Sequence, residues 1–61
     1  MKKFSAYMKL HNYTDRSMAA RVGVSSVSIM YWRLGRRVPT IAFALKIERA
    51  TKGAVTVYDW K

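Results

Sequence analysis

Apolar side chains recur three and four residues apart along most of the chain, and three glycines and one proline interrupt the pattern. This spacing places side chains on one face of an α-helix. The pattern therefore predicts four helices, at Lys2 to about Asn12, Asp15–Val22, Ser26–Leu34 and, starting near Pro39, Ile41–Ala50.

Capping residues support these boundaries. Thr14 and Ser25 each precede a predicted helix, where a hydroxyl can accept a backbone N–H of the first turn. Gly23 and Gly35 follow the second and third helices, where a left-handed residue commonly ends a helix. The sequence thus gives both central helices a start signal and a stop signal.

The last residues, Ala54 to Trp60, fit two structures. Alternating β-branched and aromatic residues are typical of a short strand. Thr56 followed three residues later by Asp59 is the spacing of a cap on a helical turn. We favour the turn, because the segment is too short to form a stable sheet alone. We therefore predict an all-α fold, in which Trp60 is either an exposed dimer contact or part of a frayed terminus.

Length and composition exclude several classes of protein. Sixty-one residues form a single domain over 1–61, with no room for a deep substrate cleft. With no cysteine and one histidine, the chain offers no zinc cluster, and nothing pairs a nucleophile with a base. We expect no enzyme activity, metal, cofactor or small-molecule substrate. No apolar run approaches the ~20 residues of a membrane span.

The charge points to a partner. Twelve Lys and Arg face three acidic residues, which gives a net charge of +9 and a pI of about 10.5. So strong a bias favours a polyanionic partner: nucleic acid, an acidic membrane surface or an acidic protein.

The segment 15–34 narrows this choice. Two short helices meet at Gly23, and Ala19, four residues earlier, is small enough to let them approach closely. Val24 and Ile29 then have the spacing to fill the core below the crossing, and Trp32 continues that inner face. This is the pattern of a helix-turn-helix, whose second helix can enter the major groove of DNA.

At this point the chain resembles a known family. The residues Ala19, Gly23, Val24, Ser25, Ile29 and Trp32 match the helix-turn-helix of phage Cro and related repressors, and the stretches 35–39 and 44–56 are similar to the second half of Cro-like and YdaS-like regulators. The resemblance spans about Thr14 to Asp59. It implies a compact four- to five-helix lambda-repressor-like domain that binds a palindromic double-stranded operator as a homodimer. It also implies a transcriptional repressor of phage or prophage origin, acting in the cytoplasm of a bacterial host.

The resemblance also implies which residues contact DNA bases. They lie at the start and on the outer face of the predicted recognition helix (about 26–34): Ser25, Ser26, Val27, Met30 and Tyr31. Many relatives carry Gln or Asn at such positions, and this face has neither, nor an Arg. We therefore expect weak hydrogen-bond readout of bases and a larger contribution from DNA shape.

Arginines are the candidate phosphate contacts. Arg33, Arg36 and Arg37 cluster at the end of the recognition helix and just after it. Asp15 stands where related repressors often place Gln, and we interpret it as an acid that stabilises the helix N-terminus. We expect neighbouring Arg16 to take the phosphate-binding role instead.

One alternative keeps the fold but changes the function. Because the predicted recognition face lacks Gln, Asn and Arg, it also suits an antitoxin-like or architectural basic module. Such a module would bind DNA non-specifically or bind an acidic protein. Two further expectations concern the second half of the chain: Glu48 pairs with a nearby Arg, and a dimer surface centres on Leu45 to Trp60.

Overall fold

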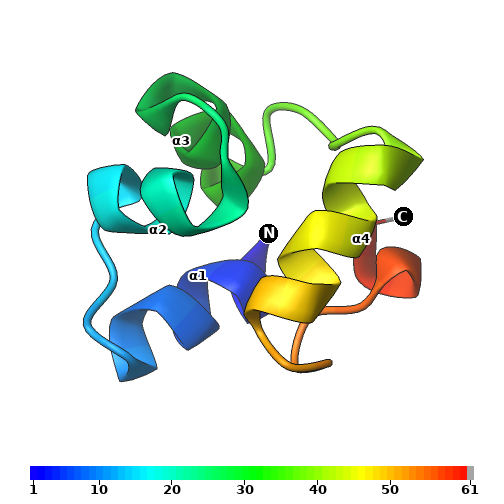
Figure 1. Ribbon diagram of the computed structural model, residues 1–61, viewed down its shortest axis with the longest axis horizontal. Helices are drawn as coiled ribbons and strands as arrows, with labels where there is room; N and C mark the ends of the chain where they lie inside the picture. The colour runs from blue at the N-terminus through cyan, green and yellow to red at the C-terminus, as the bar shows by residue number, and fades with distance from the viewer. Residues whose placement is uncertain (61) are drawn as a thin grey trace.

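Four α-helices and one short 3₁₀ turn build the fold (Figure 1). The computed structural model describes residues 1–60. The elements are α1 (Lys2–Leu10), α2 (Asp15–Val22), α3 (Ser26–Leu34), α4 (Ile41–Ala50) and η1 (Val57–Trp60). The all-α prediction is confirmed, and the described residues contain no strand. Within this range, none of the helices combines the length and apolar character needed to span a membrane.

The predicted bounds of α2 and α3 are confirmed, and their caps are formed. Thr14 Oγ1 accepts the N–H of Ser17 at 3.0 Å, and Ser17 Oγ accepts the N–H of Thr14 at 2.9 Å. This reciprocal pair satisfies two backbone donors that the helix itself leaves free. Gly23 ends α2 with φ at +86°, a conformation that glycine adopts without strain.

The other two helices differ slightly from prediction. α1 ends at Leu10 rather than Asn12, because Asn12 takes a positive φ of 58° that a right-handed helix cannot contain. Pro39 lies two residues before α4, and Thr40 caps that helix by accepting the N–H of Phe43 at 3.4 Å. Pro39 is buried against the fold instead of opening the helix.

One apolar core joins all five elements. In Figure 1, α2 and α3 lie together on the left, α1 lies below them and packs on α3, and α4 closes the right side with η1 beside it. Trp32 of α3 faces Phe43 of α4 with ring centroids 5.8 Å apart, which confirms Trp32 as a core anchor. The buried core comprises Phe4, Met8, Met18, Ala19, Val22, Ile29, Trp32, Ala44, Ile47, Val55 and Trp60.

The tail forms the predicted helical turn and not the strand. Asp59 Oδ2 accepts the N–H of Thr56 at 2.6 Å, which confirms the capping pair read from the sequence. The turn brings Trp60 back onto the core, edge-on to Phe4 with centroids 5.3 Å apart. Both expectations for Trp60 are wrong: it is neither exposed nor frayed, because its ring fills the space between α1 and α4.

The predicted pairing of Glu48 with an arginine is also wrong. Its Oε1 accepts the backbone N–H of Val57 at 3.0 Å, at the first residue of η1. Thr51 ties the same region together, since its hydroxyl donates to the carbonyl of Ile47 at 2.8 Å and accepts from the N–H of Val55 at 3.1 Å. The side chains that anchor the tail therefore bond to backbone, which secondary-structure patterns do not reveal.

Asp59 makes the tail sensitive to acid. The hydrogen bond from the Thr56 backbone, helped by Lys3 at 3.2 Å, lowers the pKa of Asp59 below its ordinary value. A lowered pKa in the folded state stabilises the fold above the ordinary pKa of ~3.9, and this stabilisation is lost as pH falls through the lowered value. We expect Asp59→Asn to be less stable than the parent at neutral pH, and the difference to shrink as pH falls below the ordinary pKa of ~3.9. Urea unfolding across this range measures the difference, and a constant difference would contradict the assignment.

Candidate nucleic-acid interface

The crossing of α2 and α3 determines which side of α3 is free. Ala19 is buried where the helices meet, and its carbonyl accepts the N–H groups of both Gly23 at 2.8 Å and Val24 at 3.0 Å. Ile29 and Trp32 are buried, so the side of α3 that carries them faces the core. The opposite side of α3 therefore lies at the surface, at the top of the molecule in Figure 1.

The five candidate base contacts differ in exposure. Ser25, Ser26 and Val27 are exposed, whereas Met30 and Tyr31 are half-buried. Ser25 also has a structural role, because its Oγ accepts the N–H of Ser28 at 3.2 Å as the cap of α3. Ser26 and Val27 are thus the predicted contacts that stand most freely on the first turn.

A shallow cavity of about 340 Å³ runs beside this face. It joins the exposed side of α3 to the α3–α4 connection and the first turn of α4. Its wall includes three predicted DNA contacts, Val27, Tyr31 and Arg37. The other lining residues are Ser28, Trp32, Val38, Pro39, Thr40 and Phe43. The contribution of α4 could not be anticipated, since it depends on how the connection folds back.

Arg37 is held against the recognition helix. Its guanidinium carbon lies 5.2 Å from the centre of the Tyr31 ring, in the geometry of a cation–π contact. Such a contact restrains a long side chain that would otherwise sample many rotamers. The structure therefore brings one predicted phosphate contact and one predicted base contact to the same place.

Arg33, a predicted phosphate contact, forms an ion pair inside the fold. Its Nε and Nη2 donate to the two carboxylate oxygens of Asp15 at 2.9 and 3.0 Å, as a bidentate ion pair between α3 and α2. The hydrogen bond with Asp15 raises the pKa of Arg33 above its ordinary value, and the carboxylate charge adds to this against the cost of burial. The sequence assigned Asp15 and Arg33 separately, to the helix dipole and to a phosphate. Their contact links the two helices, which the sequence did not predict.

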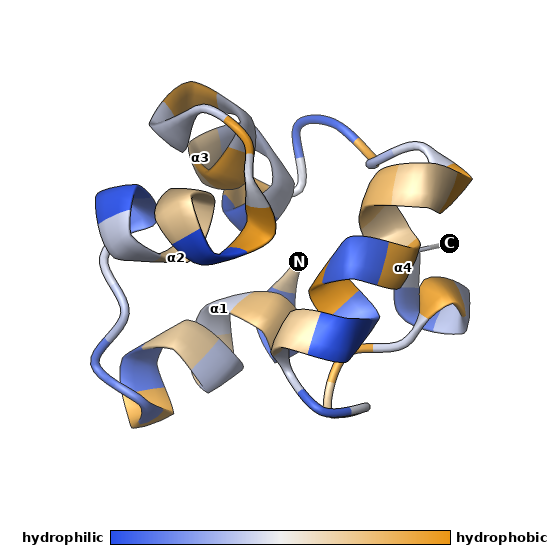
Figure 2. Ribbon diagram, viewed as in Figure 1, coloured by the Kyte–Doolittle hydropathy of each residue, from blue (hydrophilic) through white to orange (hydrophobic). Residues whose placement is uncertain are grey.

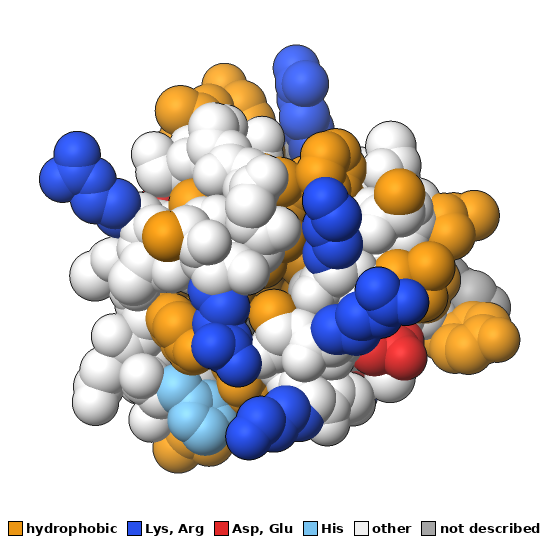
Figure 3. Space-filling view, viewed as in Figure 1, with side chains coloured by type: hydrophobic (Ala, Val, Ile, Leu, Met, Phe, Trp, Pro, Cys, Tyr) orange, Lys and Arg blue, Asp and Glu red, His pale blue; other side chains and the backbone are white. Residues whose placement is uncertain are grey.

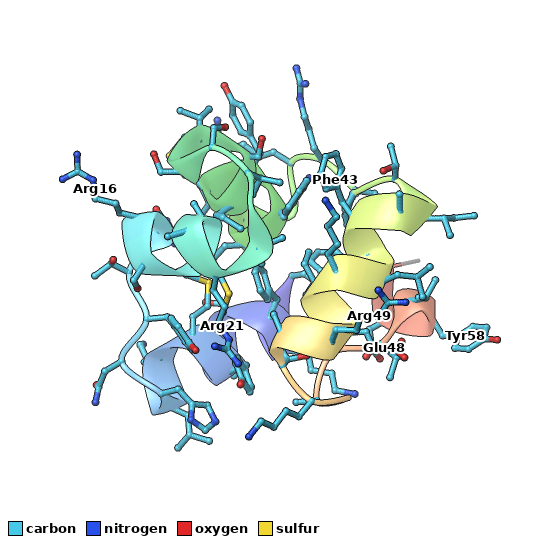
Figure 4. All side chains as sticks on the ribbon, viewed as in Figure 1. Arg16, Arg21, Phe43, Glu48, Arg49 and Tyr58 are labelled. Atoms are coloured by element: carbon cyan, nitrogen blue, oxygen red, sulfur yellow. The ribbon has the colours of Figure 1, made fainter. Side chains whose placement is uncertain are left out.

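The remaining predicted arginines are exposed. Arg16 extends from the first turn of α2 away from the body of the protein (Figure 4), and Arg36 and Arg37 lie in the α3–α4 connection. None of the three forms an ion pair with an acidic side chain in the part of the chain that is described. These charges remain available to an external anion.

Carboxylates neutralise few of the basic side chains. Asp15 pairs with Arg33 and Asp59 with Lys3, while Glu48 accepts a backbone N–H. Of the twelve Lys and Arg side chains, Lys61 lies outside the described residues and two are paired, which leaves nine without an acidic partner in residues 1–60. Three of these nine line a separate groove between α2 and α4, which sequence analysis missed because they are far apart in the chain: Arg21, Lys46 and Arg49.

The arrangement supplies positive charge and exposed polar and apolar side chains. In the range 1–60, no three His, Cys, Asp or Glu side chains gather to bind a metal ion. What the face offers is charge attraction, apolar contact at Val27 and hydroxyl groups at its first turn. Searches with protein-family models, among curated proteins and among solved structures found no match to this chain.

Proposed function

We propose that this protein is a sequence-specific transcriptional regulator that binds double-stranded DNA, and specifically a Cro-type repressor of phage or prophage origin. One observation carries the proposal: α3 packs on α2 through one side and leaves the other side exposed, next to arginines that no carboxylate neutralises. A helix presented in this way fits the major groove, which is about 12 Å wide.

In this proposal α3 reads the DNA and the arginines hold it. Ser26 and Val27 approach base edges from the first turn, and Val27 contacts a thymine methyl. Arg36, Arg37 and Arg16 bind phosphates on either side of the groove, and Tyr31 positions Arg37. The protein performs no chemistry and acts in the bacterial cytoplasm by occupying an operator.

Two copies bind one operator. A single short helix covers only a half-site, and two half-sites one helical turn apart, ~34 Å, require two protein copies. An exposed apolar surface at the start of α4 and on η1 is available for this contact. Figure 2 colours the start of α4 and part of η1 as hydrophobic, and orange side chains lie at the right edge of the molecule in Figure 3. The surface contains Ile41 at 72% exposure, Leu45 at 40% and Tyr58 at 79%. Trp60, which the sequence analysis included in the dimer surface, takes no part in it because its side chain is buried.

Selection of bound duplexes from a random pool tests the proposal. We expect an enriched palindromic site whose half-sites are one helical turn apart, bound at least about 10³-fold more tightly than random duplex at physiological salt. Equal affinity for selected and random duplexes would favour the alternative of a non-specific basic module. A single unrepeated half-site would contradict the homodimer.

The role of Val27 can be tested on the selected site. Replacing each thymine in turn with deoxyuridine removes one methyl group, worth about 0.8 kcal/mol or about fourfold in affinity when it is buried. We expect one such replacement to weaken the parent protein and to leave Val27→Ala unaffected. Similar losses for both proteins at every thymine would show that Val27 does not contact a methyl group.

A further inference from the structure

A groove between the C-terminal halves of α2 and α4 gathers positive charge away from the recognition helix. It has a volume of about 310 Å³ and is lined by Arg21, Val22, Lys46, Arg49 and Ala50. Figure 4 shows Arg21 and Arg49 coming from the two helices on the same side of the molecule, and blue side chains surround this region in Figure 3.

Contacts with the fold orient two of the three cations. Arg21 Nε donates to the carbonyl of Ala50 at 3.1 Å, which holds the guanidinium across the gap between α2 and α4. Lys46 Nζ lies 5.4 Å from the centre of the Phe43 ring. Two of the three cations that line the groove are therefore held in place by contacts with the protein.

No carboxylate in residues 1–60 forms an ion pair with these cations. Glu48 is the neighbouring acid in α4, and its Oε1 accepts the N–H of Val57 on the η1 side. Three like charges that line one groove repel each other, and none of them is neutralised by an acidic partner in this range. An anion bound between them would relieve this repulsion.

The groove and the cavity beside α3 have different linings, and they adjoin where Lys46 Nζ lies over Phe43. α3 contributes no side chain to it, and it shares no lining residue with the cavity beside α3. Arg16 and Arg21 are five residues apart on α2, which turns them about 140° from each other around the helix axis. Arg21 therefore faces a different direction from the arginine proposed to bind the operator backbone.

Its lining favours a phosphate backbone over a protein ligand. The apolar contribution is limited to Val22 and Ala50, so the groove lacks a deep pocket for the aromatic or aliphatic anchor that gives most protein interfaces their affinity. Phosphates need only positive charge and donors, which Arg21, Lys46 and Arg49 supply.

We infer that the groove lined by Arg21, Lys46 and Arg49 binds the backbone of a second DNA duplex, so that the protein can hold two duplexes together. The inference rests on the proposed function, because it takes the duplex on α3 as the first. Arg21 is turned about 140° from Arg16 around the α2 axis, and DNA is stiff over about 150 base pairs, so one straight duplex held by Arg16 does not reach Arg21 as well.

A bridging assay tests the inference with the full chain. One duplex carrying the selected site is attached to beads, and a labelled duplex of random sequence is captured from solution. We expect Lys46→Ala/Arg49→Ala to lower capture about tenfold while its affinity for a single short duplex changes less than about twofold. The matched control, Lys2→Ala/Lys9→Ala, removes the same charge from α1 and should leave capture near the parent level.

Several outcomes would overturn the inference. One is equal loss of capture in both double variants, which would reflect net charge. Another is absence of capture by the parent, or full capture by Lys46→Ala/Arg49→Ala, as expected if a dimer bridges through its two recognition helices. A third is that the parent binds a polyglutamate peptide more tightly than duplex and that Lys46→Ala/Arg49→Ala abolishes this peptide binding. That result would assign the groove to an acidic protein. Circular dichroism checks that each variant is folded. If the parent protein does not bind a single duplex at all, the proposed function is refuted instead.

Discussion

Ile47→Ala is expected to lose about 2–5 kcal/mol of unfolding free energy, the range measured when a buried aliphatic side chain is truncated. Ile47 has no exposed surface and lies in the core that joins α4 to the other helices. A domain of this size has roughly 3–9 kcal/mol of total stability, so one such cavity removes a large part of it. Urea unfolding followed by the fluorescence of buried Trp32 and Trp60 measures the loss.

Ile41→Ala provides a matched control on the same helix. The substitution is chemically identical, but Ile41 is 72% exposed, and we expect a change within about 0.5 kcal/mol at protein concentrations low enough to prevent self-association. Comparable losses for the two variants would show that the packing of α4 assigned here is wrong.

Arg36→Ala/Arg37→Ala is expected to produce the largest change in DNA binding. Each phosphate contact releases counterions, so the slope of log affinity against log salt should become less steep by about 0.9 per contact and about 1.8 for both. Both arginines are exposed beside α3 and have no acidic partner in the described chain. Fluorescence anisotropy with a short duplex over a series of salt concentrations measures the slope.

The appropriate control removes the same charge elsewhere. Lys2→Ala/Lys9→Ala lowers the net charge equally but acts on α1, which carries none of the proposed DNA contacts. We expect its salt slope to stay within about 0.5 of the parent value, since neither lysine binds a phosphate in the proposed complex. If both double variants lower the slope to the same extent, binding depends on overall charge and the interface proposed for α3 is refuted.

Arg33→Ala should behave differently from these variants. Arg33 is already engaged with Asp15, so its loss is expected to change the salt slope less than the loss of Arg36 or Arg37 would. The sequence assigned all three arginines to phosphates, because a run of positive charge after a helix gives no sign of which member has a partner inside the fold.

Local signals predicted the helices well. α2 and α3 have the bounds expected from their caps and glycines, because a cap depends on residues three or four positions apart. The capping pair of Thr56 and Asp59 likewise predicted the terminal turn. Gly23 and Ala19 predicted the helix crossing, since close approach requires a small side chain and a left-handed turn at fixed spacing.

Contacts between distant segments could not be predicted in this way. Asp15 and Arg33 are eighteen residues apart, and their ion pair exists only because α2 and α3 cross at one particular angle. Trp60 is buried because η1 returns to α1, which no local pattern specifies. Arg21 and Arg49 are distant in the chain and meet because α4 packs beside α2.

Composition and short-range spacing were enough to predict a small all-α domain with a strongly basic surface and a sharp turn between two helices at Gly23. These features follow from composition and from spacings within a few residues, where backbone geometry alone relates the side chains. Only the tertiary structure decided which charges are free, which are paired and which meet in the groove between α2 and α4. Those outcomes depend on side chains brought together by core packing, whose geometry is a property of the whole fold.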